Sequence, residues 1–257
     1  METRKKSNEL SAYAVYLEDL SSNTTLIING NDRHFLASLL KVPILLIYLK
    51  EAEKDPALLN LTFVATNNIP DQGQNLPPEQ SLTPNERYTV SELLRRMILY
   101  SDNRSANLLS VYFESKYLGN KDKIVPYALN QLGIDFVTDP ATNEEKITVA
   151  TYAQFYKIFY ESSFLAPLAS QRSLEQFAHV AFNQGLAAGI PEAVTLANKF
   201  AIRNRQGALQ LHDCGIIYHP IHPYLLCVMT RGQSEQLLAE SIATVSTMVW
   251  EYTENRL

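Results

Sequence analysis

The chain has 257 residues, of which 46% are hydrophobic and 19% charged, and its 22 Lys and Arg against 27 Asp and Glu give a formal net charge of −5. This composition is typical of a folded soluble protein and excludes dominant disorder. The longest apolar run, Val42 to Leu49, is far shorter than the ~20 residues that cross a bilayer. The basic residues form no cluster large enough to neutralise the phosphates of a nucleic acid, so we expect no nucleic-acid partner.

Predicted strands occupy both ends of the chain and predicted helices occupy its middle. Ala12 to Leu17 and Thr24 to Ile28 are rich in strand formers, which predicts an N-terminal hairpin. Apolar residues with helical spacing follow at 39–54, 89–99, 104–117, 124–131, 148–160 and 233–252, and further strands are predicted at 195–200, 209–218 and 224–230. We therefore expect one antiparallel sheet assembled from the two ends, with a helical region inserted between them.

The domain boundaries follow from this distribution. We expect a single domain over residues 1–257, with the sheet from 11–30 and 195–231 and the helical region at about 55–190. The Pro-rich stretch from Asn68 to Pro84 predicts a long surface loop rather than a domain linker. Met1 to Asn8 is polar and has no apolar core, so we expect no signal peptide in this chain.

The two cysteines, Cys214 and Cys227, exclude a disulfide-rich scaffold and a cysteine-built zinc site. The simplest interpretation is that both are small core residues. If the strands at 211–218 and 224–230 form a hairpin that pairs Tyr218 with Pro223, Cys214 lies opposite Cys227. A cross-strand disulfide is then the alternative.

Ser38 and Lys41 lie at the start of a predicted apolar helix. At a spacing of three residues the Lys amine can reach the Ser hydroxyl, and desolvation of the amine lowers its pKa so that it can act as a base. The helix N-terminus also directs backbone N–H groups toward Ser38, which suits a developing oxyanion. The alternative for this pair alone is a helix cap followed by a solvated lysine.

A second motif, Ser101-Asp102-Asn103, follows between two predicted helices. The order and spacing of Ser38-x-x-Lys41 and Ser101-Asp102-Asn103 resemble the penicillin-recognising serine enzymes, the class A β-lactamases and penicillin-binding proteins. The resemblance covers nearly the whole chain and implies a β-lactamase/transpeptidase-like α/β (α+β) fold, with a five-stranded antiparallel sheet flanked by helices. Further similar segments are 35–43, 88–90, 97–109, 211–218 and 226–230.

The resemblance implies a role for each matching residue. Ser38 would be the acyl-accepting nucleophile and Lys41 its base or proton relay. Ser101 would pass a proton to the leaving nitrogen, and Asn103 would hold the side-chain amide of the substrate.

The third motif of these enzymes, Lys-Thr-Gly on the edge strand, is only partly matched. Lys199 matches the Lys that helps to bind the substrate carboxylate, but Phe200 removes a hydroxyl and Ala201 adds a methyl where Gly allows close backbone approach. The strand can still supply the second oxyanion N–H, at Ile202.

Nearby charged residues each carry two interpretations. Arg203 or Arg205 could replace the lost carboxylate contact, or both could lie on a solvated strand edge.

Class A β-lactamases activate the deacylating water with a Glu followed by x-x-Leu-Asn, a pattern that residues 133–148 lack. Glu144 and Glu145 are expected to be a solvated pair before a helix. Loss of a general base slows deacylation by roughly 10²–10⁴-fold.

We therefore expect a serine hydrolase or acyltransferase that forms an acyl-enzyme on Ser38 and deacylates poorly. The alternatives are a non-catalytic binding module on the same fold and a working β-lactamase with an unrecognised base such as Glu144. The resemblance implies small-molecule or peptide substrates, including cell-wall peptides, and an extracytoplasmic location. No metal or organic cofactor is expected, because His219-x-x-His222 lies between prolines and is predicted to be a surface turn.

Overall fold

The computed structural model describes residues 1–257 except 7–8, 72–73, 75, 206–207 and 256–257, and it divides into two compact units. The sheet unit comprises Met1–Leu39, Phe136–Lys157 and Ala181–Leu257, and the helical unit comprises Leu40–Asp135 and Ile158–Val180. The helical unit therefore begins at Leu40 rather than near residue 55. Residues 136–157, expected in the helical region, belong to the sheet unit.

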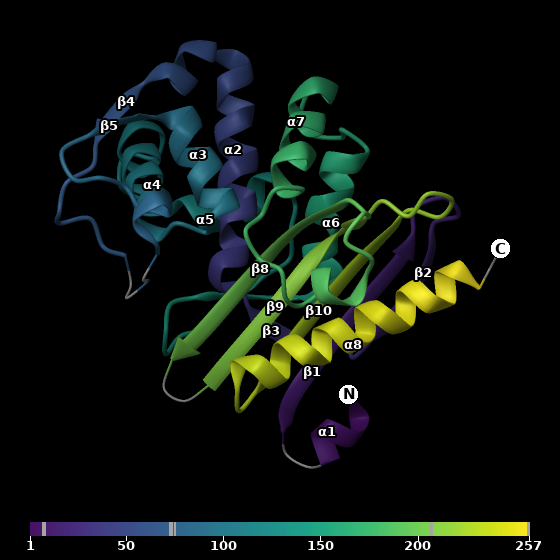
Figure 1. Ribbon diagram of the computed structural model, residues 1–257. Helices are drawn as coiled ribbons and strands as arrows, with labels where there is room; N and C mark the ends of the chain where they lie inside the picture. Colours follow the sequence, from purple (N-terminus) through teal and green to yellow (C-terminus); the bar gives the residue numbers. More distant parts are fainter. Residues whose placement is uncertain (7–8, 72–73, 75, 206–207, 256–257) are drawn as a thin grey trace. The chain divides into compact units, whose positions relative to one another are not determined.

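Five antiparallel strands form the main sheet in the order β2-β1-β10-β9-β8 (Figure 1). Strands from the two ends of the chain meet where β1 pairs with β10, so the sheet predicted from the sequence is confirmed. The strands are β1 (Leu10–Asp19), β2 (Thr24–Ile28), β8 (Leu196–Arg205), β9 (Ala208–Ile217) and β10 (Tyr224–Gly232).

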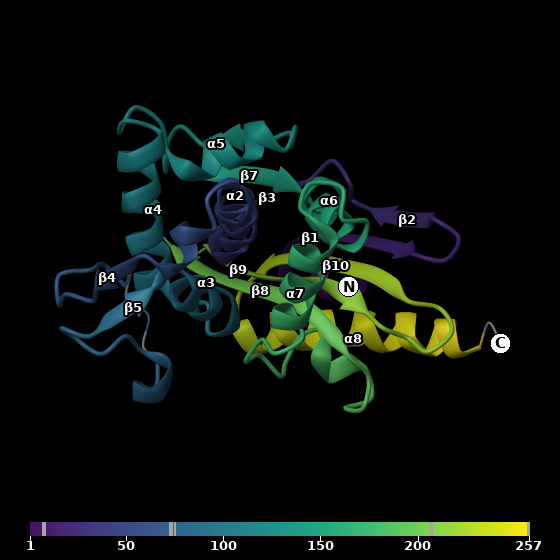
Figure 2. The same cartoon turned by 90° about the horizontal axis from the view of Figure 1, so that it is seen from above.

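The C-terminal helix α8 (Glu235–Glu254) lies along one face of this sheet, as Figures 1 and 2 show. Ser234 caps the helix, because its side chain accepts a backbone N–H of the first turn at 3.2 Å. Leu238, Ala239 and Ile242 are buried in the core that α8 forms with the strands. Removal of this apolar stripe from water holds the helix on the sheet.

The remaining elements of the sheet unit surround the main sheet. Lys157 in α6 pairs with Glu18 in β1 at 2.7 Å, and the Glu18 side chain is only 1% exposed, so this ion pair ties α6 to the sheet. A second sheet has the order β3-β7-β6. These elements are α1 (Glu2–Lys6), β3 (Arg33–Phe35), η1 (Ala37–Leu40, a 3₁₀ helix), β6 (Val137–Thr138), β7 (Glu145–Thr148), α6 (Val149–Tyr160) and η4 (Ala187–Gly189).

The helical unit is built around α2, which is buried along most of its length. Figure 2 shows α3, α4 and α5 arranged around it, and the Tyr48 hydroxyl in α2 donates to the Leu109 carbonyl in α4 at 2.6 Å. The elements are α2 (Lys41–Lys54), η2 (Pro56–Asn60), β4 (Thr62–Val64), η3 (Pro78–Gln80), β5 (Arg87–Thr89), α3 (Val90–Leu99), α4 (Asn103–Tyr117), α5 (Ile124–Gln131) and α7 (Pro167–Phe177).

The structure differs from the predicted elements in three respects. Ser38 lies in the 3₁₀ helix η1 before α2, not on an α-helix, because α2 begins only at Lys41. Helices α1 and α7 and the short strands β3 to β7 were not predicted. Leu82 is buried, so the Pro-rich segment contributes to the core as well as to the surface. No helix among the described residues is long and apolar enough to cross a membrane.

Cys214 and Cys227 form a disulfide that joins β9 to β10. They are direct partners in the strand register, as the predicted hairpin requires, and their Cα atoms are 4.0 Å apart. The structure therefore shows the alternative, a cross-strand disulfide, formed by two residues that are also part of the core. Both side chains are buried, so the bridge lies inside the sheet unit.

Candidate active site

The amine of Lys41 is buried among oxygen acceptors of the helical unit. The residue is only 1% exposed, and its Nζ donates to Ser101 O at 2.5 Å, Ser101 Oγ at 3.1 Å and Asn103 Oδ1 at 2.7 Å. Burial lowers the pKa of Lys41 from 10.5 to about 7, against the negative charge of Asp102, which raises it. A large fraction of the amine is therefore neutral near pH 7 and able to accept a proton.

A strained turn holds these acceptors in place. Helix α3 ends at Leu99, and Ser101 then adopts a left-handed backbone conformation with φ of 56°, which is uncommon for a residue other than glycine. Asp102 caps α4, because its carboxylate accepts the backbone N–H groups of Arg104 at 3.1 Å and Ser105 at 3.0 Å. Because this cap starts α4 directly after the turn, the backbone positions of Ser101 and Asn103 are fixed relative to the helix.

Ser38 lies in η1, three residues before Lys41 in the chain, and is half-buried. Ala37 precedes it with φ of 46°, and Leu39 is fully buried. Both backbone polar groups of Leu39 are hydrogen-bonded. Its N–H donates to Leu36 O at 2.9 Å, and its carbonyl accepts from the Tyr152 hydroxyl at 3.4 Å. The backbone around Ser38 is thus anchored to the sheet unit by its buried neighbour.

Lys199 and Phe200 lie together on β8. Lys199 is fully buried, and its Nζ donates to the Phe200 carbonyl at 3.0 Å and lies 4.4 Å from the centre of the Phe200 ring. The ring of Phe182 stacks on Phe200 with the centroids 4.1 Å apart. The Phe200 ring therefore packs against both the Lys199 amine and the Phe182 ring.

The backbone of β8 presents Ile202 at the edge of the sheet. Tyr218 N–H donates to Thr195 O at 3.0 Å, which makes these two residues a hydrogen-bonded pair. Hydrogen-bonded pairs alternate along an antiparallel ladder, and β8 pairs with β9 without a register shift. Phe200 and Ile202 therefore direct their backbone groups away from β9, and β8 is the last strand of the sheet order. The Ile202 N–H is therefore directed to the open side of this edge strand.

Arg203, Arg205 and Glu144 form an ion-pair cluster in the sheet unit. The Arg203 guanidinium lies 3.9 Å from the centre of the Phe35 ring and contacts Glu144 at 2.5 Å, and Arg205 contacts the other carboxylate oxygen at 3.3 Å. The interpretation of Glu144 as a solvated residue is therefore incomplete, because it pairs with two arginines. The Arg203 side chain is largely buried in this cluster rather than solvated at the strand edge. Glu145 lies in strand β7 rather than before a helix, and burial raises the pKa of its carboxyl.

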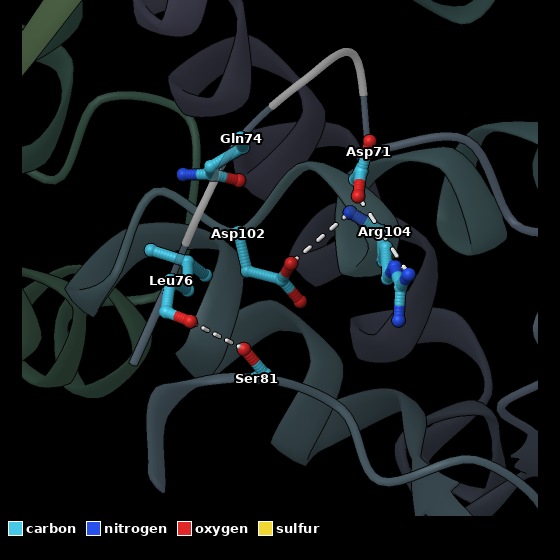
Figure 3. Close-up of a pocket in the computed structure, with 6 residues that line it drawn as sticks. All are labelled: Asp71, Gln74, Leu76, Ser81, Asp102 and Arg104. Carbon is cyan, nitrogen blue, oxygen red and sulfur yellow. Dashed lines mark hydrogen bonds and ion pairs between the residues drawn. The ribbon is translucent and has the colours of Figure 1, made fainter. Parts of the chain in front are cut away.

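A contact that the sequence did not reveal joins the Pro-rich loop to the Ser-Asp-Asn turn. Gln74 Nε2 donates to Ser101 O at 3.1 Å, and Asn103 N–H donates to Gln74 Oε1 at 2.8 Å. Asn103 Nδ2 donates to Asp71 O at 2.8 Å. Gln74 and Asp71 line a pocket of about 170 Å³ together with Asp102 and three other residues. Figure 3 shows how these side chains lie. The only signal for this contact in the sequence was an amide side chain in a proline-rich loop.

The predicted site residues divide between the two units. Those of the helical unit contact one another: Lys41, Ser101 and Asn103. Those of the sheet unit come from η1 and β8: Ser38, Lys199, Ala201 and Ile202.

The histidines at 219 and 222 lie in a turn, as predicted. His219 Nδ1 accepts the backbone N–H groups of Ile221 and His222, and its Nε2 contacts Glu254 at 2.7 Å. His219 is nevertheless buried, so only part of this turn is surface. Among the described residues no three His, Cys, Asp or Glu side chains are arranged to hold a metal ion.

The fold and these contacts define a class of protein. A five-stranded antiparallel sheet made from both chain ends, a Ser-x-x-Lys turn and a Ser-Asp-Asn turn that holds the lysine amine are the marks of penicillin-recognising serine hydrolases. The model of the beta-lactamase enzyme family matches residues 3–253, and the chain belongs to this family. A search of curated proteins finds no match.

Solved structures of this class have the same fold. A class A beta-lactamase from Mycobacterium abscessus has a TM-score of 0.82 at 20% identity, covering 98% of this chain and 97% of that one. A structure of PBP-A has a TM-score of 0.77 at 20% identity, covering 95% and 90%. A point mutant of PBP-A, solved as an acyl-enzyme complex with penicillin-G, has a TM-score of 0.79 at 19% identity, covering 99% and 94%.

Proposed function

We propose that the protein forms an acyl-enzyme on Ser38 with peptide-like or β-lactam carbonyls and releases the acyl group slowly. The observation that carries this proposal is the buried amine of Lys41, whose pKa of about 7 makes it a base at neutral pH. A scaffold without catalytic activity has no need of a buried amine beside the Ser101 hydroxyl, and burying it costs stability.

In the proposed cycle, neutral Lys41 takes the Ser38 Oγ proton as the oxygen attacks the carbonyl carbon and forms a C–O bond. The C–N bond of the substrate then breaks, and Ser101 Oγ, which lies 3.1 Å from Lys41 Nζ, passes a proton to the leaving nitrogen. The proton lost by Ser38 thus reaches the leaving group through Lys41 and Ser101. This exchange of a C–N bond for a C–O bond is balanced without a further reactant.

The proposed binding groups come from Asn103, Lys199 and the β8 backbone. Asn103 Nδ2 would bind the side-chain amide of the substrate in place of the Asp71 carbonyl, and the strand at Ala201 would lie beside the substrate. The outward N–H of Ile202 would stabilise the oxyanion. Because Arg203 already forms an ion pair with Glu144, Lys199 is the proposed binding group for the substrate carboxylate.

Slow deacylation is supported by the state of Glu144. Arg203 contacts one oxygen of its carboxylate and Arg205 contacts the other, so both oxygens are already engaged. A working β-lactamase would need another base to activate water. By analogy with the family, we propose cell-wall peptides as physiological substrates and an extracytoplasmic location.

The test is intact mass spectrometry after incubation with benzylpenicillin. We expect an adduct of one penicillin that persists for many minutes and is lost in Ser38→Ala and strongly slowed in Lys41→Met. An adduct that survives in Ser38→Ala contradicts the proposal. Absence of any adduct with penicillin and with an activated ester supports the binding module instead, and rapid appearance of hydrolysed penicillin supports a β-lactamase.

A further inference from the structure

The carbonyl of Ser101 and the backbone N–H of Asn103 both bind the side-chain amide of Gln74. Gln74 Nε2 donates to Ser101 O at 3.1 Å and Gln74 Oε1 accepts from Asn103 N–H at 2.8 Å. One amide group therefore bridges the two ends of the Ser-Asp-Asn turn. An amide is suited to this, because it carries a donor and an acceptor side by side.

The Gln74 bridge supplies a hydrogen-bond acceptor to a backbone N–H group that the turn itself does not satisfy. The first N–H groups of a helix have no partner within the helix. Asp102 accepts those of Arg104 and Ser105, and the acceptor of Asn103 N–H within the described part of the chain is Gln74 Oε1. Ser101 adopts a left-handed conformation, which a non-glycine residue keeps only when its surroundings hold it.

The same two residues position Lys41. Ser101 O accepts Lys41 Nζ at 2.5 Å as well as Gln74 Nε2, and Asn103 Oδ1 accepts Lys41 Nζ at 2.7 Å. A shift of the turn therefore moves the acceptors of the amine, together with the Ser101 hydroxyl. Gln74 thus binds directly to both residues, Ser101 and Asn103, that accept hydrogen bonds from the Lys41 amine.

We propose that Gln74 is a positioning residue for acyl transfer, whose side-chain amide fixes the Ser101 carbonyl and the Asn103 backbone so that Lys41 and Ser101 keep the alignment that proton transfer requires. This inference rests on the proposed acylation of Ser38. The Asp71–Arg104 ion pair, at 3.6 Å, supports the same loop against α4. Small misplacements of reacting groups cost up to about 100-fold in rate.

The first experiment separates the acylation step from binding. In Gln74→Met, which has a similar length but neither amide atom, we expect the maximal rate of penicillin adduct formation to fall about 10- to 100-fold. The dissociation constant of the preceding non-covalent complex should change by a smaller factor than this rate, because Gln74 itself is not placed among the substrate-binding groups and acts on binding only through Asn103. Equal acylation rates in Gln74→Met and the parent protein overturn the proposal.

The second experiment needs no acylation. Hydrogen exchange of single amides, measured by NMR, should speed up by about tenfold or more at Asn103 in Gln74→Met, since an unbonded helix-end amide is exposed to exchange. The amides of Arg104 and Ser105 should be unchanged, because Asp102 still caps them. Gln74→Glu keeps an acceptor for Asn103 and loses the donor to Ser101, so it should retain Asn103 protection and still acylate slowly.

The matched control is Gln80→Met, the same substitution in the same loop. Gln80 contacts Arg96 through its backbone carbonyl at 3.3 Å, so this variant should acylate at the parent rate. If the parent protein forms no Ser38 adduct, the proposed function fails, and the exchange of Asn103 still decides whether Gln74 holds the turn. Unchanged exchange at Asn103 in Gln74→Met overturns the positioning role.

Discussion

Lys41 combines two properties that usually exclude each other, deep burial and several oxygen acceptors. Burial favours the neutral amine, whereas Ser101 O, Ser101 Oγ and Asn103 Oδ1 favour the ammonium that donates to them. Desolvation is the larger effect, since the pKa falls from 10.5 to about 7. The balance places the titration of this one group in the range where a base for Ser38 is useful.

The rate of acylation should therefore depend on pH through Lys41. We expect the second-order rate of penicillin adduct formation to rise about tenfold per pH unit below pH 7 and to level off above it, because the neutral amine is the reactive form. His34 and His212 cannot produce this profile, since burial lowers their pKa values to about 4 and about 3. Quenched time courses from pH 5.5 to 9, read by intact mass, measure it.

Lys41→Met is the control for this profile, and its residual acylation should lose the inflection near pH 7. A parent protein whose acylation rate is flat over the same range would show that Lys41 is not the base. The shape of the curve thus tests the role of one side chain independently of the absolute rate.

At the scale of helices and strands, the sequence predicted helix boundaries well where a capping residue marks the start of the helix. Thr89 and Asp102 cap α3 and α4, and both helix starts were predicted to within one residue. Helix α7 was missed because its buried residues are Ser170, Ser173 and Phe177, so its sequence lacks an apolar stripe. The short strands β3 to β7 are too brief for an alternating pattern to emerge.

The disulfide between β9 and β10 should add measurable stability. It closes a loop with a sequence separation of 13, and the loss of chain entropy in the unfolded state amounts to about 3 kcal/mol for a loop of this size. Reduction should lower the thermal midpoint by roughly 5–10 °C. Thermal unfolding with and without reductant measures this shift. A Cys214→Ala, Cys227→Ala double variant should not respond to reductant, and a parent protein equally insensitive would contradict the bridge.

At the scale of the whole molecule, the sequence predicted the five-stranded sheet and the proximity of Lys41 to Ser101, but not the contacts that hold the Ser-Asp-Asn turn. The roles of Ser38, Lys41 and Ser101 were inferred from motif spacing, which depends on local turns. The bridge from Gln74 to Ser101 spans 27 residues along the chain and follows no period, so no pattern in the sequence indicates it. The tie between Arg203 and Glu144 likewise joins segments 59 residues apart.

The buried amine also links activity to the stability of the whole fold. Because the folded-state pKa of Lys41 is lowered from 10.5 to about 7, the unfolded chain binds more protons than the folded protein between these pH values. The free energy of unfolding therefore gains from this group as pH rises from 7 to 10.5, with a slope approaching ~1.4 kcal/mol per pH unit. Below pH 7 both states carry the proton, so the slope from this group vanishes.

Chemical denaturation of the parent protein and Lys41→Met across pH 6 to 10 measures this contribution as a difference, in which all other titrating groups cancel. The stability of Lys41→Met relative to the parent should fall steadily as pH rises above 7, because only the parent gains from deprotonation of the buried amine. Lys116→Met, at an exposed position of α4, is the matched control, because it removes a lysine side chain that is not buried. Parallel stability curves for the parent protein and Lys41→Met would mean that the amine is solvated in the folded protein, and the base assigned to Ser38 would then be lost with it.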